Sequence, residues 1–153
     1  MKKLIKDRQG RVLEFSQKRI EELVYFKLEF HRACAAYVNC RINGEVLMLE
    51  DIFVEEKCVV RNPDLLSRLL GRKTLAVNFR KQGFGSQMLT TVVAYARSKG
   101  LKRIEGRLKE KDLVPNPNLP QWYKKRGFTI VDSQIYLNLV KATTDDSRYM
   151  PKN

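Results

Sequence analysis

The residues best suited to chemistry lie near the middle of the chain, where two basic side chains precede two closely spaced glycines. They are Arg80, Lys81, Gln82, Gly83, Phe84, Gly85 and Ser86. Because glycine has no Cβ, a ligand can approach the backbone here closely. If a helix begins at the glycines, its first amides lack partners within the helix and its dipole adds partial positive charge, a combination that binds phosphate. The segment therefore predicts a site for an anionic ligand.

The flanking residues indicate that this segment joins a strand to a helix. Residues 74–79 are rich in strand formers, and residues 86–98 place apolar side chains at helical spacing before Gly100. A plain tight turn would also explain the glycines. A dinucleotide-binding loop would need a third glycine or alanine where Met88 stands, and a P-loop would need a Gly-Lys-Ser/Thr sequence that this chain lacks.

A second motif follows at residues 122–128, with the sequence Trp-Tyr-Lys-Lys-Arg-Gly-Phe. Together, Arg-x-x-Gly-x-Gly and the later Tyr-x-x-x-Gly-Phe resemble the GNAT acyltransferases, in which the first motif binds the pyrophosphate of acetyl-CoA. Asn116 stands seven residues before Tyr123, where many members have an asparagine. The resemblance is good over residues 80–140 and patchy before them.

The resemblance implies an α/β fold of the GNAT type. Such a fold has a mixed, mostly antiparallel central sheet flanked by helices, with a parallel strand pair at the cofactor site. The implied activity is the direct transfer of an acetyl group from acetyl-CoA to a primary amine, without an acyl-enzyme. The alternative is a non-catalytic GNAT-like module that binds acyl-CoA or nucleic acid.

The same resemblance assigns roles in holding the cofactor. Backbone amides from Gln82 into the first helical turn would take the pyrophosphate, while Arg80 and Lys81 would add charge. Asn116 would hydrogen-bond the pantetheine arm or a residue near it. A backbone amide at the end of the cofactor strand would stabilise the carbonyl oxygen. The candidates for that amide are Ile52, Phe53 and Val54.

Tyr123 is the candidate general acid, because a tyrosine with a pKa of about 10 keeps its proton at neutral pH and can give it to a thiolate. Its neighbour Trp122 is expected to pack. The base stays open: Glu50 and Asp51 are candidates, Glu105 stands behind them, and a chain of water molecules would also suffice. Adjacent residues of a strand point to opposite faces, so at most one of Glu50 and Asp51 is expected to face a given cleft.

Most of the N-terminal half reads as strands. Residues 4–5 and 12–15 predict a small hairpin, and residues 24–30 and 35–42 alternate as strands do. Residues 45–54 are expected to return through a two-residue turn at Asn43-Gly44. Residues 17–23 suggest one or two helical turns. The pair of helices that the family usually has after its first strand is not evident.

Residues 62–71 interrupt the family pattern. Asn62, Pro63 and Asp64 are typical of a helix start, Gly71 is typical of its end, and the four leucines between them predict a buried stripe. Two alignments follow. In the favoured one, residues 49–54 are the cofactor strand and residues 55–77 are an insertion. In the other, residues 74–79 are that strand.

After the loop helix, residues 101–108 predict a strand parallel to the cofactor strand. Asn118 is expected to cap the last helix, with Gln121 completing a box-like cap. Gly127 should end this helix, and residues 128–131 and 135–140 should form two closing strands. Residues 141–153 are expected to be a loose tail.

Composition limits the remaining possibilities. A chain of 153 residues predicts one domain. Its formal net charge of +13 suits an anionic ligand such as coenzyme A and could also attract nucleic acid.

The chain has three cysteines, no Cys-x-x-Cys sequence and one histidine, His31. Neither a disulfide framework, a metal site nor a Ser-His-Asp triad is therefore expected. No apolar run is long enough to span a membrane, and the first residues do not read as a signal peptide, so we expect a cytoplasmic protein.

Overall fold

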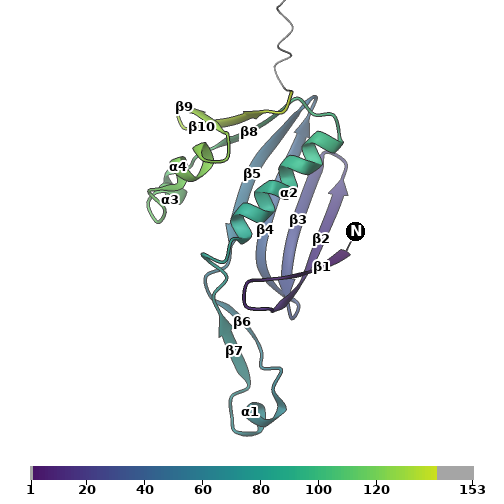
Figure 1. Ribbon diagram of the computed structural model, residues 1–153, viewed down its shortest axis with the longest axis vertical. Helices are drawn as coiled ribbons and strands as arrows, with labels where there is room; N and C mark the ends of the chain where they lie inside the picture. Colours follow the sequence, from purple (N-terminus) through teal and green to yellow (C-terminus); the bar gives the residue numbers. More distant parts are fainter. Residues whose placement is uncertain (1, 141–153) are drawn as a thin grey trace, which may run out of the picture.

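The computed structural model describes residues 2–140, in which eight strands form one sheet beside a long helix (Figure 1). The strands are β1 (Lys2–Lys6), β2 (Val12–Ile20), β3 (Leu23–Phe30), β4 (Ala33–Asn43), β5 (Val46–Val54), β6 (Cys58–Arg61), β7 (Thr74–Val77), β8 (Arg103–Arg107), β9 (Thr129–Val131) and β10 (Gln134–Asn138). The helices are α1 (Leu65–Leu69), α2 (Phe84–Ser98), α3 (Glu110–Leu113) and α4 (Leu119–Lys124).

The sheet has the order β1-β2-β3-β4-β5-β8-β10-β9. Its neighbours are antiparallel except for β5 and β8, which run parallel. A parallel pair requires a crossover, and α2 provides it. The predicted fold class, a mostly antiparallel sheet with one parallel pair, is thereby confirmed.

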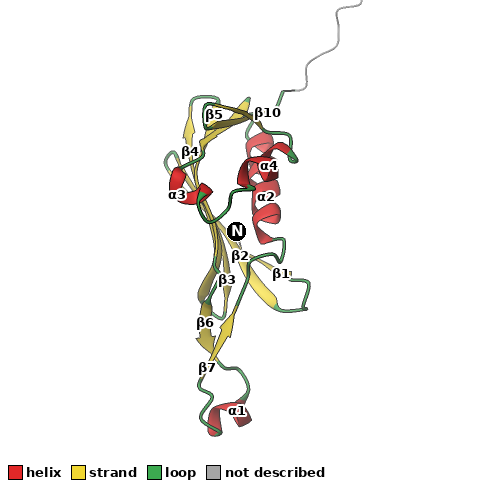
Figure 2. Ribbon diagram, turned by 90° about the vertical axis from the view of Figure 1, so that its left-hand side faces the viewer, coloured by secondary structure: helices red, strands yellow, loops and turns green. Residues whose placement is uncertain are grey.

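One face of the sheet is apolar and packs against α2. Along β3, Val24, Phe26 and Leu28 are buried, whereas the intervening Lys27 is exposed. The helix buries Met88, Leu89, Val92 and Ala96. Figure 2 shows α2 and α4 on the same side of the sheet and α3 on the other side. Within residues 2–140, no helix combines the length and the apolar character needed to cross a membrane.

The expectation of helical turns at residues 17–23 is wrong. The strand β2 continues to Ile20, and its register with β3 runs unbroken from Glu14↔Glu29 to Ile20↔Leu23. Pairing with β3 prevails over the weak local preference for helix. The turn between β4 and β5 also lies one residue later than the predicted Asn43-Gly44 turn. Asn43 pairs with Val46, which leaves Gly44 at φ +57 inside the turn.

No helix precedes α1 in the part of the chain that the structure describes, so the family's usual helix pair is absent there. The strands β1 and β2 are joined directly by a short turn that contains Gly10 at φ +77. The predicted hairpin at this end of the chain is confirmed.

The residues from β6 to β7 form an arm that projects from the sheet (Figure 1). The two strands pair only with each other in the described structure, and α1 lies at the tip. The leucines of this helix are 63–75% exposed and the following Leu70 is 77% exposed, so the predicted buried stripe is wrong. Because the tip projects from the sheet, none of the described residues supplies an apolar surface that covers them.

The arm decides between the two alignments. It is β5 that pairs in parallel with β8, whereas β7 pairs with β6. Residues 49–54 are therefore the strand beside the crossover, as in the favoured alignment, and the arm lies within the insertion. The alignment that used residues 74–79 is wrong.

The ends of the helices refine the other expectations. The helix α2 begins at Phe84 rather than at Ser86. In α1 the cap is Asp64, whose carboxylate accepts hydrogen bonds from the amides of Leu66 and Ser67. Asn118 precedes α4 without a side-chain cap hydrogen bond, so the predicted box-like cap is wrong. The predicted loose tail lies outside the described residues.

Candidate active site

The strands β5 and β8 separate partway along their length. Their parallel register runs from Val46↔Arg103 to Leu49↔Gly106 and then ends. At the same point β5 bulges against β4, because Asp51 faces Asn39 and Leu49 faces Cys40, which leaves Glu50 as an extra residue. A bulge bends its strand and ends regular pairing. The sheet therefore opens beyond Leu49.

Gly106 makes the close approach at this point possible. A Cβ on Gly106 would lie 3.1 Å from the carbonyl oxygen of Leu49 and 3.2 Å from the side chain of Ile135. We expect Gly106→Ala to lower the free energy of unfolding by about 1–3 kcal/mol, because a packed site must shift to accept the methyl group. Urea denaturation measures this.

The matched control for this substitution is Gly85→Ala. A Cβ on Gly85 would meet its nearest neighbours at 3.6 and 3.8 Å, which is ordinary contact. Alanine also favours helix over glycine, so this variant should be as stable as the wild type or more stable. Equal unfolding curves for Gly106→Ala and the wild type would contradict the tight contact.

A cleft of about 1150 Å³ lies at the opening of the sheet. It is lined by the end of β5, the loop before α2, the residues around α3, and α4. The predicted site residues that line it are Glu50, Asp51, Ile52, Phe53, Val54, Arg80, Lys81, Gly83, Phe84, Gly85, Ser86, Asn116 and Tyr123. Gln82 and Glu105 are not among its lining residues, and Glu105 instead pairs with Arg103.

The glycine loop leaves the start of α2 open. Gly83 precedes the helix at φ +87 and ψ 0, a conformation that favours glycine, and no side chain among residues 2–140 caps the helix. The amide of Arg80 donates to Asn78 Oδ1 at 2.8 Å, which fixes the turn before the loop. The first amides of α2 therefore border the cleft without a side-chain partner.

One end of the Arg80 guanidinium already forms an ion pair. Its Nη1 atom lies 3.2 Å from Glu56 Oε2, a carboxylate at the base of the arm. Ser86 is also engaged, because its Oγ accepts a hydrogen bond from Arg126. The Arg126 guanidinium lies 4.1 Å from the centre of the Trp122 ring. Arg126 thus connects α4 to the first turn of α2, and Trp122 packs as expected.

Tyr123 lies in α4 and is only 3% exposed. Its ring packs edge-on against Phe128, and its hydroxyl has no hydrogen-bond partner among the residues described. Burial raises the pKa of Tyr123 well above its ordinary value, and the nearby Asp112 and Asp51 add to the shift. The hydroxyl therefore holds its proton at neutral pH.

The two candidate bases have different partners. Asp51 Oδ2 accepts a hydrogen bond of 3.1 Å from the Tyr37 hydroxyl. Glu50 is exposed and lies 2.8 Å from Arg41 Nε. Both residues line the cleft, so the opposite-face argument does not by itself choose between them. The reason is the bulge at Glu50, which breaks the alternation of the strand.

Tyr37 was missed by the sequence reasoning. It faces Phe53 across β4 and β5, and the two rings stack with centres 5.4 Å apart. Burial and the neighbouring Asp51 raise the pKa of Tyr37, which keeps it a hydrogen-bond donor. Its place in an alternating strand gave no sign of this role, because the contact depends on the register between two strands.

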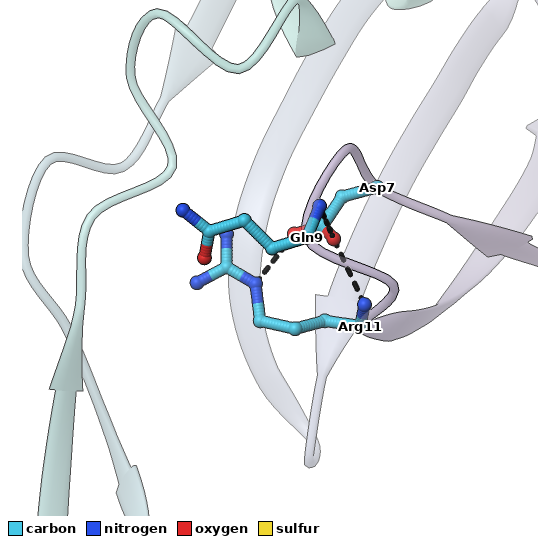
Figure 3. A network of polar contacts seen from close by, with 3 residues as sticks. All are labelled: Asp7, Gln9 and Arg11. Carbon is cyan, nitrogen blue, oxygen red and sulfur yellow. Dashed lines mark hydrogen bonds and ion pairs between the residues drawn. The ribbon is translucent and has the colours of Figure 1, made fainter.

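A turn between β1 and β2 also reaches the cleft through Arg8, which the sequence reasoning missed as well. Figure 3 shows how Asp7 holds this turn. Asp7 Oδ1 accepts hydrogen bonds of 2.8 Å from the amides of Gln9 and Arg11, and Oδ2 pairs with Arg11 Nε. The Arg11 guanidinium lies 4.9 Å from the centre of the Phe79 ring, just before the glycine loop. We call this arrangement of Asp7, Arg11 and Phe79 the turn clasp.

The turn clasp should make stability depend on pH. Burial alone would raise the pKa of Asp7, but the hydrogen bonds from Arg11 and Gln9 outweigh it and hold the pKa below its ordinary value. A carboxylate with a lowered pKa contributes stability above its unfolded pKa of about 3.9 and loses it as the pH falls through the folded value. We expect Asp7→Asn to cost about 1–3 kcal/mol at pH 7 and less below pH 4.

Urea denaturation at several pH values measures this difference. Asp132→Asn is the control, since Asp132 is an exposed turn residue at φ +47, which asparagine tolerates. A constant difference between Asp7→Asn and the wild type from pH 7 to pH 3.5 would contradict a role for the Asp7 charge.

The cysteines are free thiols: Cys34 is partly buried, and Cys40 and Cys58 are buried. Burial raises the pKa of Cys40 to about 12, which makes it a poor nucleophile. Within residues 2–140, no three histidine, cysteine, aspartate or glutamate side chains lie together so as to hold a metal ion. His31 lies in the β3–β4 turn and packs against Phe30.

Comparison with known proteins agrees with this geometry. The family model described as the acetyltransferase (GNAT) family matches residues 7–128. No curated protein matches the chain significantly. Among solved structures, the ribosomal-protein-S18-alanine N-acetyltransferase of Escherichia coli is 15% identical, with a TM-score of 0.56 over 83% of this chain and 76% of that one.

Two structures from Thermoplasma species are also similar. Ard1 from Thermoplasma volcanium is 14% identical, with a TM-score of 0.53 over 76% of this chain and 71% of that one. The PaiA N-acetyltransferase from Thermoplasma acidophilum, solved with coenzyme A, is 11% identical, with a TM-score of 0.50 over 76% of this chain and 60% of that one. At these identities the likeness establishes the fold.

Proposed function

The chain belongs to the GNAT family of acetyltransferases, and we propose that it transfers an acetyl group from acetyl-CoA directly to a primary amine. The observation that carries this proposal is a single cleft that joins the open start of α2 to the separated ends of β5 and β8. Anion binding and acyl transfer can then take place on one extended ligand.

The residues present fit coenzyme A. The uncapped amides at Gly83 and the following turn suit the pyrophosphate, with Lys81 adding positive charge. Asn116 lines the same cleft, and we assign it a hydrogen bond to the pantetheine arm or to a residue near it. We assign the backbone of residues 52–54 to the thioester carbonyl, because the described part of the chain gives β5 no strand partner on its β8 side there.

The proposed reaction forms a bond between the amine nitrogen and the acetyl carbon as the bond from that carbon to sulfur breaks. Tyr123 gives its proton to the departing sulfur. Asp51, directly or through water, takes the proton that the amine loses. We assign this role to Asp51 rather than Glu50, because the Glu50 carboxylate is held by Arg41. The high pKa of Cys40 supports transfer without an acyl-enzyme.

The first test is thermal unfolding with and without acetyl-CoA, with NAD as the control ligand. A ligand present at about 100 times its Kd stabilises a folded protein by about 2.7 kcal/mol, which raises the Tm by several degrees. Release of CoA in the presence of a panel of amines then measures transfer. A shift with acetyl-CoA but none with NAD is expected.

No shift at millimolar acetyl-CoA would count against the proposal. Binding without CoA release for any amine would favour the alternative, a GNAT-like module that senses acyl-CoA. The net charge of +13 also allows a nucleic-acid-binding module, and tight RNA or DNA binding that weakens steeply with salt would support it.

A further inference from the structure

We infer that Arg8, in the turn between β1 and β2, is a second phosphate-binding group of the cofactor site and contacts the phosphates of coenzyme A at the start of α2. This inference rests on the proposed function and adds to it a binding residue that lies outside both sequence motifs. Its ligand class is a phosphorylated nucleotide end, either the pyrophosphate or the 3′-phosphate.

The position of Arg8 comes first. It lines the cleft, and its Nη2 atom lies 3.7 Å from the point that a Cβ on Gly83 would occupy. Gly83 is the residue that precedes α2, so the guanidinium lies beside the start of the helix. A phosphate bound at the first amides of α2 would lie within reach of this side chain.

The charge of Arg8 is also uncompensated. Its side chain is exposed and has no ion pair or hydrogen bond to any other residue between 2 and 140. Arg80, the arginine of the glycine motif, is by contrast paired with Glu56. Arg8 therefore has more of its donors available to an anion than Arg80 has, and such charge-assisted contacts are the stronger hydrogen bonds.

The turn that carries Arg8 is held in place. The turn clasp fastens Asp7 to Arg11 on either side of Arg8, and Arg11 packs on Phe79 at the entry to the glycine loop. Figure 1 shows this turn extending toward the end of α2 that follows β7. A short, fastened turn brings the guanidinium to the loop with little loss of chain entropy.

The test is isothermal titration calorimetry of CoA, dephospho-CoA and pantetheine against the wild type and Arg8→Gln. We expect Arg8→Gln to raise the Kd of CoA about tenfold, with Tm unchanged, because the side chain has no partner in the described residues. Arg61→Gln is the matched control, since Arg61 is exposed on the arm and does not line the cleft. Arg8→Lys should keep part of the affinity.

Comparing CoA with dephospho-CoA, which lacks the 3′-phosphate, shows which phosphate Arg8 contacts. A loss of affinity for CoA and dephospho-CoA alike assigns Arg8 to the pyrophosphate, and a loss for CoA alone assigns it to the 3′-phosphate. Equal Kd values for Arg8→Gln, Arg61→Gln and the wild type would overturn the inference while leaving the proposed function intact. A wild-type protein that binds no CoA would overturn the proposed function and this inference with it.

Discussion

Replacing Tyr123 with phenylalanine should lower kcat by about 100-fold or more while the Kd of acetyl-CoA changes by less than about twofold. The substitution removes one hydroxyl and keeps the ring that packs against Phe128. That hydroxyl makes no hydrogen bond to another described residue, so its loss should disturb little besides proton transfer. Steady-state kinetics and calorimetry on the same preparation separate the two effects.

Tyr95→Phe is the matched control for this experiment. Tyr95 is also a buried tyrosine, and its hydroxyl is buried without a partner among residues 2–140, but it lies on α2 outside the cleft. Removing an unpartnered buried hydroxyl should leave kcat unchanged and stability equal or higher. If Tyr123→Phe retained the wild-type kcat, Tyr123 would not be the acid.

The pH profile offers an independent check on Tyr123. Its acid form is present below its pKa, and burial raises that pKa above the ordinary value of about 10. Tyr123 should therefore stay protonated between pH 7 and about pH 9.5, and its ionisation should cause no decline in kcat in this range. A decline in this range would indicate a different proton donor.

The contiguous motifs of the sequence predicted the centre of the structure well. The loop from Arg80 to Ser86 does join a strand to a long helix, and Gly83 takes a positive φ there. Such features depend on neighbours in the chain, so local sequence is enough to foresee them. The parallel pairing of β5 and β8 followed from the crossover rule in the same way.

Features that depend on register were not predictable. The bulge at Glu50 arises from how β4 pairs with β5, and it changes which acids line the cleft. Tyr37 becomes a partner of Asp51 through that same pairing. No spacing within one strand reveals such a contact, because the partner strand sets it.

The prediction of a buried leucine stripe in α1 was wrong for a different reason. Their spacing is that of a buried helical stripe, but the helix sits at the tip of an arm whose strands pair only with each other in the described structure. Periodicity predicts an apolar face and does not supply the surface that covers it. The arm's base nevertheless serves the site, since Glu56 lines the cleft and pairs with Arg80.

The short connection from β1 to β2 links the unusual N-terminal half to the site. Where a longer connection with helices would stand over the sheet, a clasped turn brings Arg8 to the start of α2. The first turn of that helix is consequently approached by side chains from three elements: the β1–β2 turn, the glycine loop and α4. A substitution that changes the charge in the first turn of α2 should therefore mainly alter the affinity for the anionic ligand.

Ser86→Asp tests this directly and should raise the Kd of acetyl-CoA by at least about 30-fold. A carboxylate in the first turn of α2 would lie near the proposed pyrophosphate, and like charges about 4 Å apart repel by several kcal/mol at the effective dielectric of a protein surface. The same carboxylate suits the apo protein, because it faces the positive end of the helix and Arg126, which already donates to Ser86 Oγ. We therefore expect an unchanged or higher Tm without ligand, together with the loss of binding.

Ser86→Asn is the control, since it has nearly the size of aspartate and no charge. Its Kd for acetyl-CoA should stay much closer to that of the wild type, and pantetheine, which has no phosphate, should show no difference between the two variants. An apo protein at least as stable as the wild type, together with weaker binding of acetyl-CoA but not of pantetheine, would place the repulsion at the phosphates. Equal affinity of Ser86→Asp and the wild type for acetyl-CoA would mean that the pyrophosphate binds elsewhere.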